Sequence, residues 1–421
     1  MSEKFSKKIK HYTHNDEDLE ISRSYEFLTK QFLPEINTIT VDDSVLDQIR
    51  MVGLELLKRV EDDNQYQTTM IYNHIGRWIY YVNKINECVL WTTVSGKNHR
   101  LNSNITNLPK ELRPFLRVNG KPLGGIDISS SQPYILSSIM NINFFNDTSE
   151  GYNLYTIYPE LYEKLVEEGY IKTDVSYTSG NTINYVTSIS GSSINKEEVF
   201  QHTSPPFMLC KFSNSEIEDI YNYQSAQYEN DFYMDVIEKY TQTTGEVIED
   251  ENQRQKLKKT MMFVLFDDNY YHRNNNQYIQ MFGSVYPGVN KWIEKIHRLI
   301  GRSQFAYLLQ RCESYLMLNI VAREFHDKNP EAPIFSIHDA LLTYPEYIPE
   351  IAGMTQNRFK EIIGTGVGVK NKTSTRDPRL TLVEIDEVWK EIEPIKTEKK
   401  FDKVAGSVLA SNIEKGLDFL K

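Results

Sequence analysis

Two aspartates that lie far apart in the chain have closely similar surroundings. Asp127 stands between two isoleucines in GGIDISSSQ (124–132), and Asp339 follows the apolar run IFSIH (334–338). A carboxylate among apolar side chains is costly to bury unless a partner neutralises it. If the two strand-like segments pair, their carboxylates would repel each other. A divalent cation such as Mg²⁺, which prefers oxygen ligands, would remove that cost, so the pattern predicts a metal site.

Each aspartate also has an ordinary explanation. An aspartate before a run of serines is a typical helix cap, here of a helix that would begin near Ser130, and His-Asp pairs are common at turns. On these two residues alone the ordinary explanation is favoured. The metal interpretation is chemically specific, because two metal ions about 4 Å apart between two aspartates would serve in-line phosphoryl transfer.

A helical segment supplies a third element, RQKLKKTMMFVLF (254–266). Residues four apart share one slowly drifting stripe of a helix, and the stripe here is Arg254, Lys258, Met262 and Phe266. Its cations could hold a triphosphate through charge-assisted hydrogen bonds, with the apolar end under the base and sugar. Taken alone, the segment is better explained as an amphipathic helix with a solvated basic face.

Together the three elements resemble the palm and fingers motifs of the family A DNA polymerases and the single-subunit phage-type RNA polymerases. That superfamily carries a metal-binding aspartate with a serine two residues on, an Arg-Lys-aromatic helix, and a His-Asp hairpin. The matching residues are Asp127 and Ser129, then Arg254, Lys258 and Phe266, then His338 and Asp339. The order of the motifs agrees, which is far more specific than any single match.

Two weaker similarities extend the resemblance over roughly residues 96–365. HRLNSNITNLPKELR (99–113) resembles the primer-gripping stretch ahead of the palm, with Arg100 as the matching arginine. LLQRCESYLML (308–318) resembles the glutamine-bearing helix before the last motif, with Gln310 near template or primer.

The sequence also departs from the pattern of the superfamily. Asp267 replaces the glycine that usually follows the aromatic of the second motif, and Ala340 replaces the glutamate of the DNA enzymes. A Ser/Thr/Asn-rich stretch near 171–206 reads as an insertion. We expect no proofreading exonuclease in this sequence, because the Asp-x-Glu spacing at 18–20 lies in a polar tail that reads as a solvated run of charges.

The resemblance implies a role for each matching residue. Asp127 and Asp339 would hold two Mg²⁺ ions, and Lys258 would protonate the leaving group. The incoming nucleoside triphosphate would contact Arg254, Lys258, Met262 and Phe266, with Gln132 gating its sugar. Arg100, Gln310 and His338 would contact the primer–template nucleic acid.

Two positions of the resemblance indicate whether the incoming nucleotide carries ribose or deoxyribose. Gln132 is bulky where RNA enzymes have a small residue, and Phe266 lacks the hydroxyl that would bond a ribose 2′-OH, so an apolar site there discriminates only weakly. Both favour deoxynucleotides, whereas Ala340 and Met262 lean toward the RNA branch.

We therefore expect a small DNA polymerase without an exonuclease. The alternatives are an RNA polymerase or primase, a degenerate nucleic-acid-binding protein of a phage or mobile element, and a two-metal nuclease, which would leave the basic helix unexplained.

The expected fold is α+β, a right-hand polymerase with an antiparallel-sheet palm, mostly helical fingers and a short N-terminal helical, thumb-like region. The expected segments are a polar tail (1–24), the thumb-like region (25–120), the palm (121–150 and 305–365), the fingers (151–304) and a charged C-terminal tail (366–421), whose last part, 404–420, could form an amphipathic helix.

The net charge of the chain does not indicate a nucleic-acid partner. The chain has 421 residues and a net charge of −11, whereas a nucleic-acid footprint is usually basic. A local basic groove would suffice. Basic residues that could form one, or simply a charged helix face, are Lys291, Lys295, Arg298, Arg302 and Arg311.

Composition favours a cytoplasmic protein. Three cysteines without metal-ligand spacing suggest a reducing compartment. The first residues are polar, unlike a signal peptide, and no stretch is long and apolar enough to cross a membrane.

Overall fold

The computed structural model describes residues 10–11, 21–60, 64–140, 142–145, 151–169, 171, 213–229, 231–245, 247, 252–266, 276–364, 366–372, 382–392 and 407–420. The insertion near 171–206, most of the polar tail and Asp267 lie outside these residues. The fold mixes helices with small, mostly antiparallel sheets. None of the helices within the described ranges is long and apolar enough to span a membrane.

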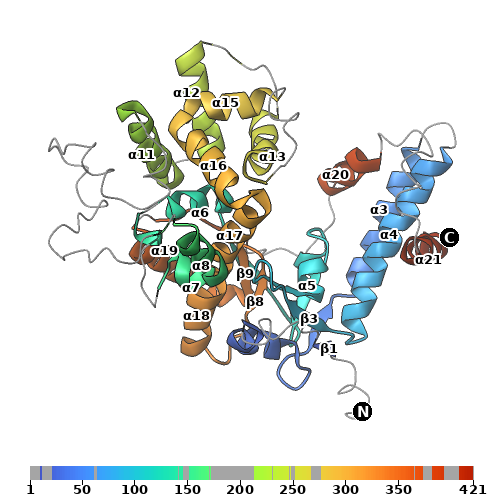
Figure 1. Ribbon diagram of the computed structural model, residues 1–421. Coiled ribbons are helices and arrows are strands. Elements are labelled where there is room, and N and C mark those ends of the chain that lie inside the picture. The colour runs from blue at the N-terminus through green and yellow to red at the C-terminus, as the bar shows by residue number, and fades with distance from the viewer. Residues whose placement is uncertain are drawn as a thin grey trace.

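A four-stranded antiparallel sheet lies at the centre of the molecule, in the order β10-β7-β9-β8 (Figure 1). Its strands are β7 (Gly124–Ile128), β8 (Phe335–Ile337), β9 (Ala340–Thr343) and β10 (Val369–Lys372). The segments around Asp127 and Asp339 are therefore neighbouring strands, as their similar sequence patterns predict. In β7, the side chains of Ile126 and Ile128 are buried in the core, which fixes the face that this strand presents to it.

Helices pack against this sheet. Helix α17 (Arg302–Ser314) continues through the π-helical segment η4 (Tyr315–Ala322) into α18 (Arg323–Lys328). Segment η4 packs on β9, and α19 (Ile348–Ile363) packs on β7 and β10. Helix α6 (Ser131–Ile139) follows β7, is buried along its whole length and packs on α17. Two elements adjoining the site, α6 and α17, are thus held in the core.

A second group of helices stands above the sheet in Figure 1. Its members are α11 (Asn214–Glu229), α12 (Phe232–Thr244), α13 (Gln253–Phe266), α15 (Gln277–Val285) and α16 (Pro287–Ile300), with η3 (Ile142–Phe145), α7 (Leu154–Ile157) and α8 (Pro159–Glu167) beside α17. Buried aromatic rings join α11, α12, α15 and the start of α16, with Tyr223, Phe232, Phe282 and Tyr286 in mutual contact. Their apolar core is continuous with the core under the sheet.

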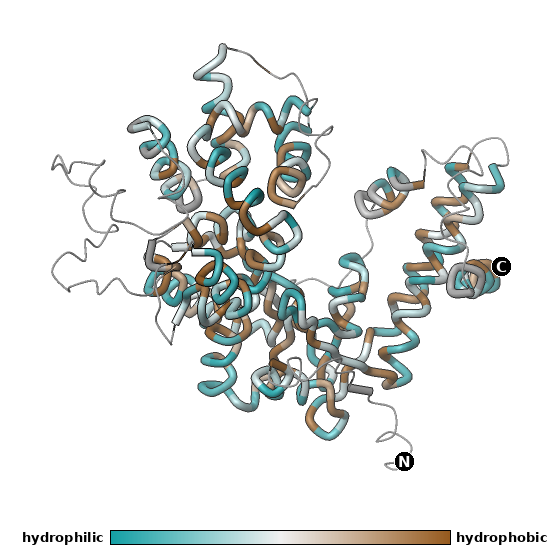
Figure 2. The backbone as a smooth tube through the Cα atoms, in the orientation of Figure 1, coloured by the Kyte–Doolittle hydropathy of each residue, from teal (hydrophilic) through white to brown (hydrophobic). Residues whose placement is uncertain are grey.

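The N-terminal part has its own apolar core. Long helices α3 (Ser44–Lys58) and α4 (Gln65–Asn86) lie side by side there, and Figure 2 shows apolar and polar residues alternating along them, as expected of helices with one buried face. The smaller elements are β1 (Lys10–His11), α2 (Glu26–Thr29), η1 (Lys30–Phe32), β2 (Ile39–Val41), β3 (Trp91–Val94), β4 (Leu101–Ser103), α5 (Asn104–Asn107), η2 (Arg113–Phe115), β5 (Leu116–Val118), β6 (Lys121–Pro122) and η5 (Pro345–Tyr347).

The segment assigned from the sequence to a charged tail contributes three elements to the fold. Strand β10 forms one edge of the central sheet, while α20 (Leu382–Ile392) and α21 (Ser407–Leu420) pack on α3 and α4. Leu420 of α21 is buried in the N-terminal core, so α21 shares one apolar core with α3 and α4.

Two glycines allow α4 and α21 to cross at close range. A Cβ atom at Gly76 would overlap the carbonyl oxygen of Asn412, and one at Gly416 would overlap the carbonyl oxygen of Tyr72. Backbone atoms cannot move aside as flexible side chains can. We expect Gly76→Ala or Gly416→Ala to lower the free energy of unfolding by about 2–3 kcal/mol, the cost of an overpacked contact, in urea denaturation.

Gly353 supplies the control for this prediction. It lies within helix α19, and nothing lies within 4 Å of a Cβ placed there. Gly353→Ala should therefore stabilise the protein by about 0.5–1 kcal/mol through helix propensity. If all three variants unfold at the same urea concentration, the close crossing of α4 and α21 is not what holds the C-terminal helix in place.

Candidate active site

The strand register brings the two aspartates together. Asp127 of β7 is paired with Ala340 of β9, the residue directly after Asp339. Asp339 and His338 form the two-residue turn between β8 and β9, and His338 takes up the left-handed conformation at φ 55°, as tight hairpin turns require. The backbone N–H of Ile128 also donates to the carbonyl oxygen of Asp339, at 3.4 Å.

The pKa of Asp339 reflects the acidic groups near it. Burial, then the charges of Glu313 and Asp127, raise the pKa of Asp339 to about 7, while Arg100 acts in the opposite direction. Neighbouring carboxylates disfavour each other's ionisation in this way. The sequence pattern predicts this repulsion between Asp127 and Asp339, but not the third carboxylate.

Glu313 is the central residue that the sequence argument missed. Its side chain is 2% exposed and pairs with Arg100, which donates from Nε at 3.1 Å and from Nη2. It also accepts from Ser131 Oγ at 2.6 Å and from Gln132 Nε2 at 2.5 Å. A lone glutamate among residues expected on a buried helix, as in QRCESYLML, is the signal that could have found it, because an isolated charge is rarely buried without a partner.

Glu313 thereby links two residues with predicted roles. Gln132 lies at the start of α6, is 8% exposed, and its Oε1 atom has no hydrogen-bond partner among the described residues. Arg100 lies just before β4. The carboxylate of Glu313 therefore holds both Gln132 and Arg100 close to Asp339.

The two remaining residues predicted to contact nucleic acid adjoin this cluster. His338 is exposed at the hairpin turn, and partial desolvation and the charge of Arg100 lower its pKa. Gln310 of α17 accepts a hydrogen bond from Asn98 Nδ2 at 3.0 Å. The loop that carries Asn98 and Arg100 is thus attached to α17 at Gln310 and Glu313.

The residues of the predicted stripe on helix α13 differ in their exposure to solvent. Lys258 is exposed and Met262 is 44% exposed. Phe266, by contrast, packs against the larger apolar core. Arg254 donates from Nε to Asp231 at 2.6 Å and lies over the ring of Tyr233, 5.5 Å from its centroid.

Tyr233 of α12 connects α13 to the aspartates and was also missed. Burial raises its pKa to about 12; a hydrogen bond with Ser130 and the charge of Arg254 lower it, and Asp231 and Asp339 raise it. Its hydroxyl therefore lies near the end of β7 and the hairpin turn, while its ring lies under Arg254. This places the start of α13 on the same side of the sheet edge as the aspartate pair.

The five basic residues of α16 and α17 do not form one open surface. Lys291 pairs with Glu216 at 3.0 Å and Arg298 with Glu294 at 3.6 Å. Arg311 is buried and donates to the carbonyl oxygens of Gly96 and Lys97. At least Arg311 therefore has a structural role, since it holds the loop before Arg100.

The aspartate pair suits a magnesium ion better than a metal that needs many protein ligands. Within the described ranges, no group of three or more His, Cys, Asp or Glu side chains could hold a metal ion. Mg²⁺ is usually bound through one or two carboxylates, with waters and substrate phosphates completing its shell. The oxygen donors of Asp127 and Asp339, and the unfavourable crowding of charge around Asp339, fit that mode of binding.

No protein-family model matches the sequence, and no curated protein matches it. Among solved structures, the chain is similar to the POL domain of Pol1 from M. smegmatis, which was determined in complex with a DNA primer-template and dNTP. The two are 12% identical with a TM-score of 0.32, and the match covers 84% of this chain and 69% of that one.

Proposed function

We propose that the protein is a template-directed nucleotidyltransferase that extends a primer with deoxynucleoside triphosphates and uses two Mg²⁺ ions. The observation that carries the proposal is the β7–β9 register, which sets Asp127 beside Asp339. Helix α13, with an exposed lysine and Arg254 near its start, is linked to this pair through Tyr233, whose ring lies under Arg254 and whose pKa the charge of Asp339 raises. A two-metal nuclease would use the aspartates but would not need these cations.

The proposal assigns parts of the fold to the parts of a right hand. The sheet β10-β7-β9-β8 with α17 would be the palm, the helices between residues 151 and 304 the fingers, and α3 and α4 the thumb. In this assignment α20 and α21, which pack on α3 and α4, also belong to the thumb.

The residues of the chain would divide the reaction between them. When bound by Asp127 and Asp339, Mg²⁺ would lower the pKa of the primer 3′-hydroxyl and offset the charge of the leaving pyrophosphate. Arg254 and Lys258 would hold the triphosphate through charge-assisted hydrogen bonds. Lys258 would donate a proton to the pyrophosphate oxygen that leaves, and Met262 and Phe266 would support the nucleotide.

Sugar selection would depend on Gln132. Because Glu313 holds its amide nitrogen, the side chain has a fixed position and can exclude a 2′-hydroxyl by its bulk. Arg100, Gln310 and His338 would contact the primer–template end.

Primer extension tests the proposal directly. A labelled DNA primer–template is incubated with dNTPs or rNTPs, with Mg²⁺ or with EDTA. Magnesium-dependent extension with dNTPs is the expected result. Extension with rNTPs, or synthesis without a primer, would select the RNA polymerase or primase instead. Duplex binding without incorporation of either nucleotide would contradict the proposal.

The ion pair of Arg254 leads to a second prediction. Asp231 competes for the guanidinium that would bind the triphosphate, so Asp231→Asn should lower the KM for dNTP by about 2–5-fold, equivalent to ~0.4–1 kcal/mol. Asparagine is chosen because Asp231 also caps α12 by accepting from the N–H groups of Tyr233 and Met234, and asparagine can do the same.

Two further variants serve as controls for the KM of Asp231→Asn. Arg254→Ala should raise the KM, opposite to Asp231→Asn. Glu294→Gln removes an acidic partner from Arg298 on α16 and should leave the KM unchanged. A KM that rises in Asp231→Asn would show that Asp231 assists nucleotide binding and does not compete with it.

A further inference from the structure

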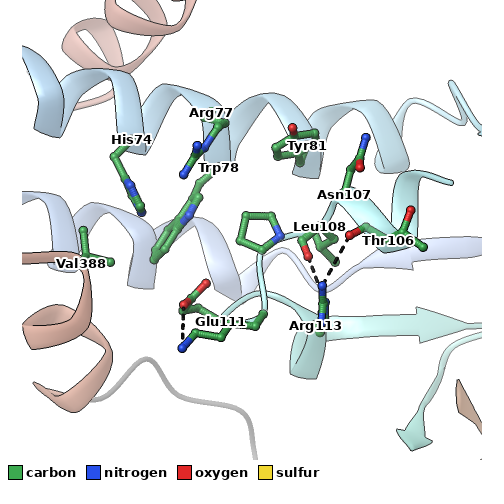
Figure 3. Close-up of a pocket in the computed structure, with 12 residues that line it drawn as sticks. His74, Arg77, Trp78, Tyr81, Thr106, Asn107, Leu108, Glu111, Arg113 and Val388 are labelled. Carbon is green, nitrogen blue, oxygen red and sulfur yellow. Dashed lines mark hydrogen bonds and ion pairs between the residues drawn. The ribbon is translucent and has the colours of Figure 1, made fainter. Parts of the chain in front are cut away.

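A cavity of about 320 Å³ lies between α4, the segment 106–113 and Val388 of α20 (Figure 3). Its size is at the lower end of the ~300–1,000 Å³ typical of small-molecule sites. Asp127 and Asp339 do not line it, and none of the roles proposed above uses it.

Two buried nitrogen atoms of side chains that line this cavity have no hydrogen-bond partner among the described residues. They are Nε2 of His74 and Nε1 of Trp78, on successive turns of α4 with ring centroids 4.9 Å apart. A buried polar atom without a partner costs about 1–3 kcal/mol. Burial and the charge of Arg77 lower the pKa of His74 to about 3, so its ring is neutral at pH 7 and can donate or accept. The indole N–H of Trp78 can only donate.

The cavity also carries positive charge in an acidic protein. Arg77, Lys110 and Arg113 line it with one carboxylate, Glu111, whose oxygen lies 3.8 Å from Lys110 Nζ. Arg113 is oriented by donating to the carbonyl oxygens of Leu108 at 3.0 Å and Thr106 at 3.4 Å. Fixed guanidinium groups of this kind suit phosphate oxygens.

The cavity borders the candidate active site through Arg113. Burial lowers the pKa of Arg113, and the carboxylates of Glu111 and Asp127 oppose that effect. The guanidinium is therefore within electrostatic reach of both the cavity and the aspartate pair.

We propose that this cavity binds one nucleotide unit, with its phosphate held by Arg77 and Arg113 and its base hydrogen-bonded to His74 and Trp78 once these two rings, whose nitrogens are covered in this structure, turn toward it. Phosphate alone would leave the two ring nitrogens unsatisfied, whereas a base supplies acceptors and a donor beside an anionic group. The same chemistry is presented by a free nucleotide and by an unpaired nucleotide at the end of a strand. The proposal does not depend on the polymerase reaction.

Fluorine NMR of the full-length protein labelled with 5-fluorotryptophan tests this site. The chain has four tryptophans, and Trp78→Phe identifies the resonance of Trp78. The protein carries Asp127→Asn and EDTA is present, so that nucleotide bound through metal ions at the aspartates does not contribute. The probes are dAMP, a single-stranded dT6 oligonucleotide and inorganic phosphate.

We expect dAMP, dT6 or both to shift the Trp78 resonance with a saturable Kd below about 1 mM. Arg77→Glu, on the exposed side of α4, should weaken that binding at least tenfold, and Arg50→Glu, an exposed residue of α3, should not. A response to dAMP alone identifies a free nucleotide as the ligand, and a response to dT6 alone identifies a strand. Equal responses to phosphate and dAMP, no response to any probe, or binding unaffected by Arg77→Glu would each overturn the proposal.

Discussion

Asp127→Asn and Asp339→Asn are each expected to reduce primer extension by about 10³-fold or more. Asparagine keeps the shape of the side chain but removes the charge that would hold Mg²⁺, and metal ions contribute several kcal/mol of transition-state stabilisation. A loss of ~4 kcal/mol corresponds to about 10³-fold in rate. The measurement is the single-turnover rate of adding one dNTP to a labelled primer at saturating Mg²⁺.

Glu55→Gln is the control for the two aspartate variants. Glu55 of α3 makes a surface ion pair with Lys58 at 3.2 Å, so the variant loses a carboxylate at a position far from the sheet edge in the sequence and the fold. Its extension rate should stay within about twofold, as expected for a surface pair worth less than ~1 kcal/mol. Either aspartate variant retaining more than a tenth of the wild-type rate would contradict the two-metal assignment.

The same site gives a pH dependence that needs no activity measurement. The pKa of Asp339 in the folded protein is about 7, above its usual value, because the side chain is buried and Glu313 and Asp127 face it, while Arg100 compensates only in part. The folded state therefore binds the proton more tightly than the unfolded state. Without metal, this group's contribution to stability is present below about pH 4 and is lost as the pH rises through about 7.

Asp339→Asn should therefore be more stable than the wild type at pH 8 in EDTA, and the difference should vanish near pH 4. One pKa unit is worth about 1.4 kcal/mol, so we expect a gain of ~1–3 kcal/mol in urea denaturation. Added Mg²⁺ should stabilise the wild type at pH 8 but not the variant. A variant that is less stable than the wild type at pH 8 without metal would show that the charge of Asp339 is already compensated.

Local sequence patterns predicted the strands and helices that carry most of the candidate residues. The apolar runs on either side of Asp127 and before Asp339 indicated paired strands, because alternating β-branched residues suit a buried sheet. The stripe of α13 was correctly placed on a helix, since its residues recur at steps of four. What periodicity could not supply was the environment of each side chain. Phe266 is partly buried against the core, although Met262, one turn earlier, is 44% exposed.

The residues that the sequence argument missed are linked by tertiary contacts alone. Glu313 and Arg100 are far apart in the chain, and only the docking of the loop before β4 onto α17 makes them an ion pair. Tyr233 lies on a helix with no motif, yet the packing of α12 places it between Arg254 and Ser130. The cavity beside His74 needs α4, the segment 106–113 and α20 together. No local sequence pattern encodes these tertiary contacts.

The second large effect is expected at Glu313. In Glu313→Gln, the two carboxylate oxygens that accept from Arg100, Ser131 and Gln132 are replaced by one acceptor and one donor. At least one of these buried donors loses its partner, and Arg100 loses its counter-charge, so we expect a loss of about 2–4 kcal/mol in stability. Because Gln132 is then held less firmly, the preference for dNTP over rNTP in kcat/KM should fall about tenfold, equivalent to ~1.4 kcal/mol.

Two readouts separate this positioning role from a loss of stability. Removing the charge of Glu313 also removes a cause of the raised pKa of Asp339, so the pH midpoint of extension at limiting Mg²⁺ should move below that of the wild type. Gly416→Ala, which is expected to destabilise the distant contact between α4 and α21, should change neither the sugar preference nor this midpoint. If Glu313→Gln behaves like Gly416→Ala in both measurements, Glu313 only supports the fold and Gln132 selects the sugar without it.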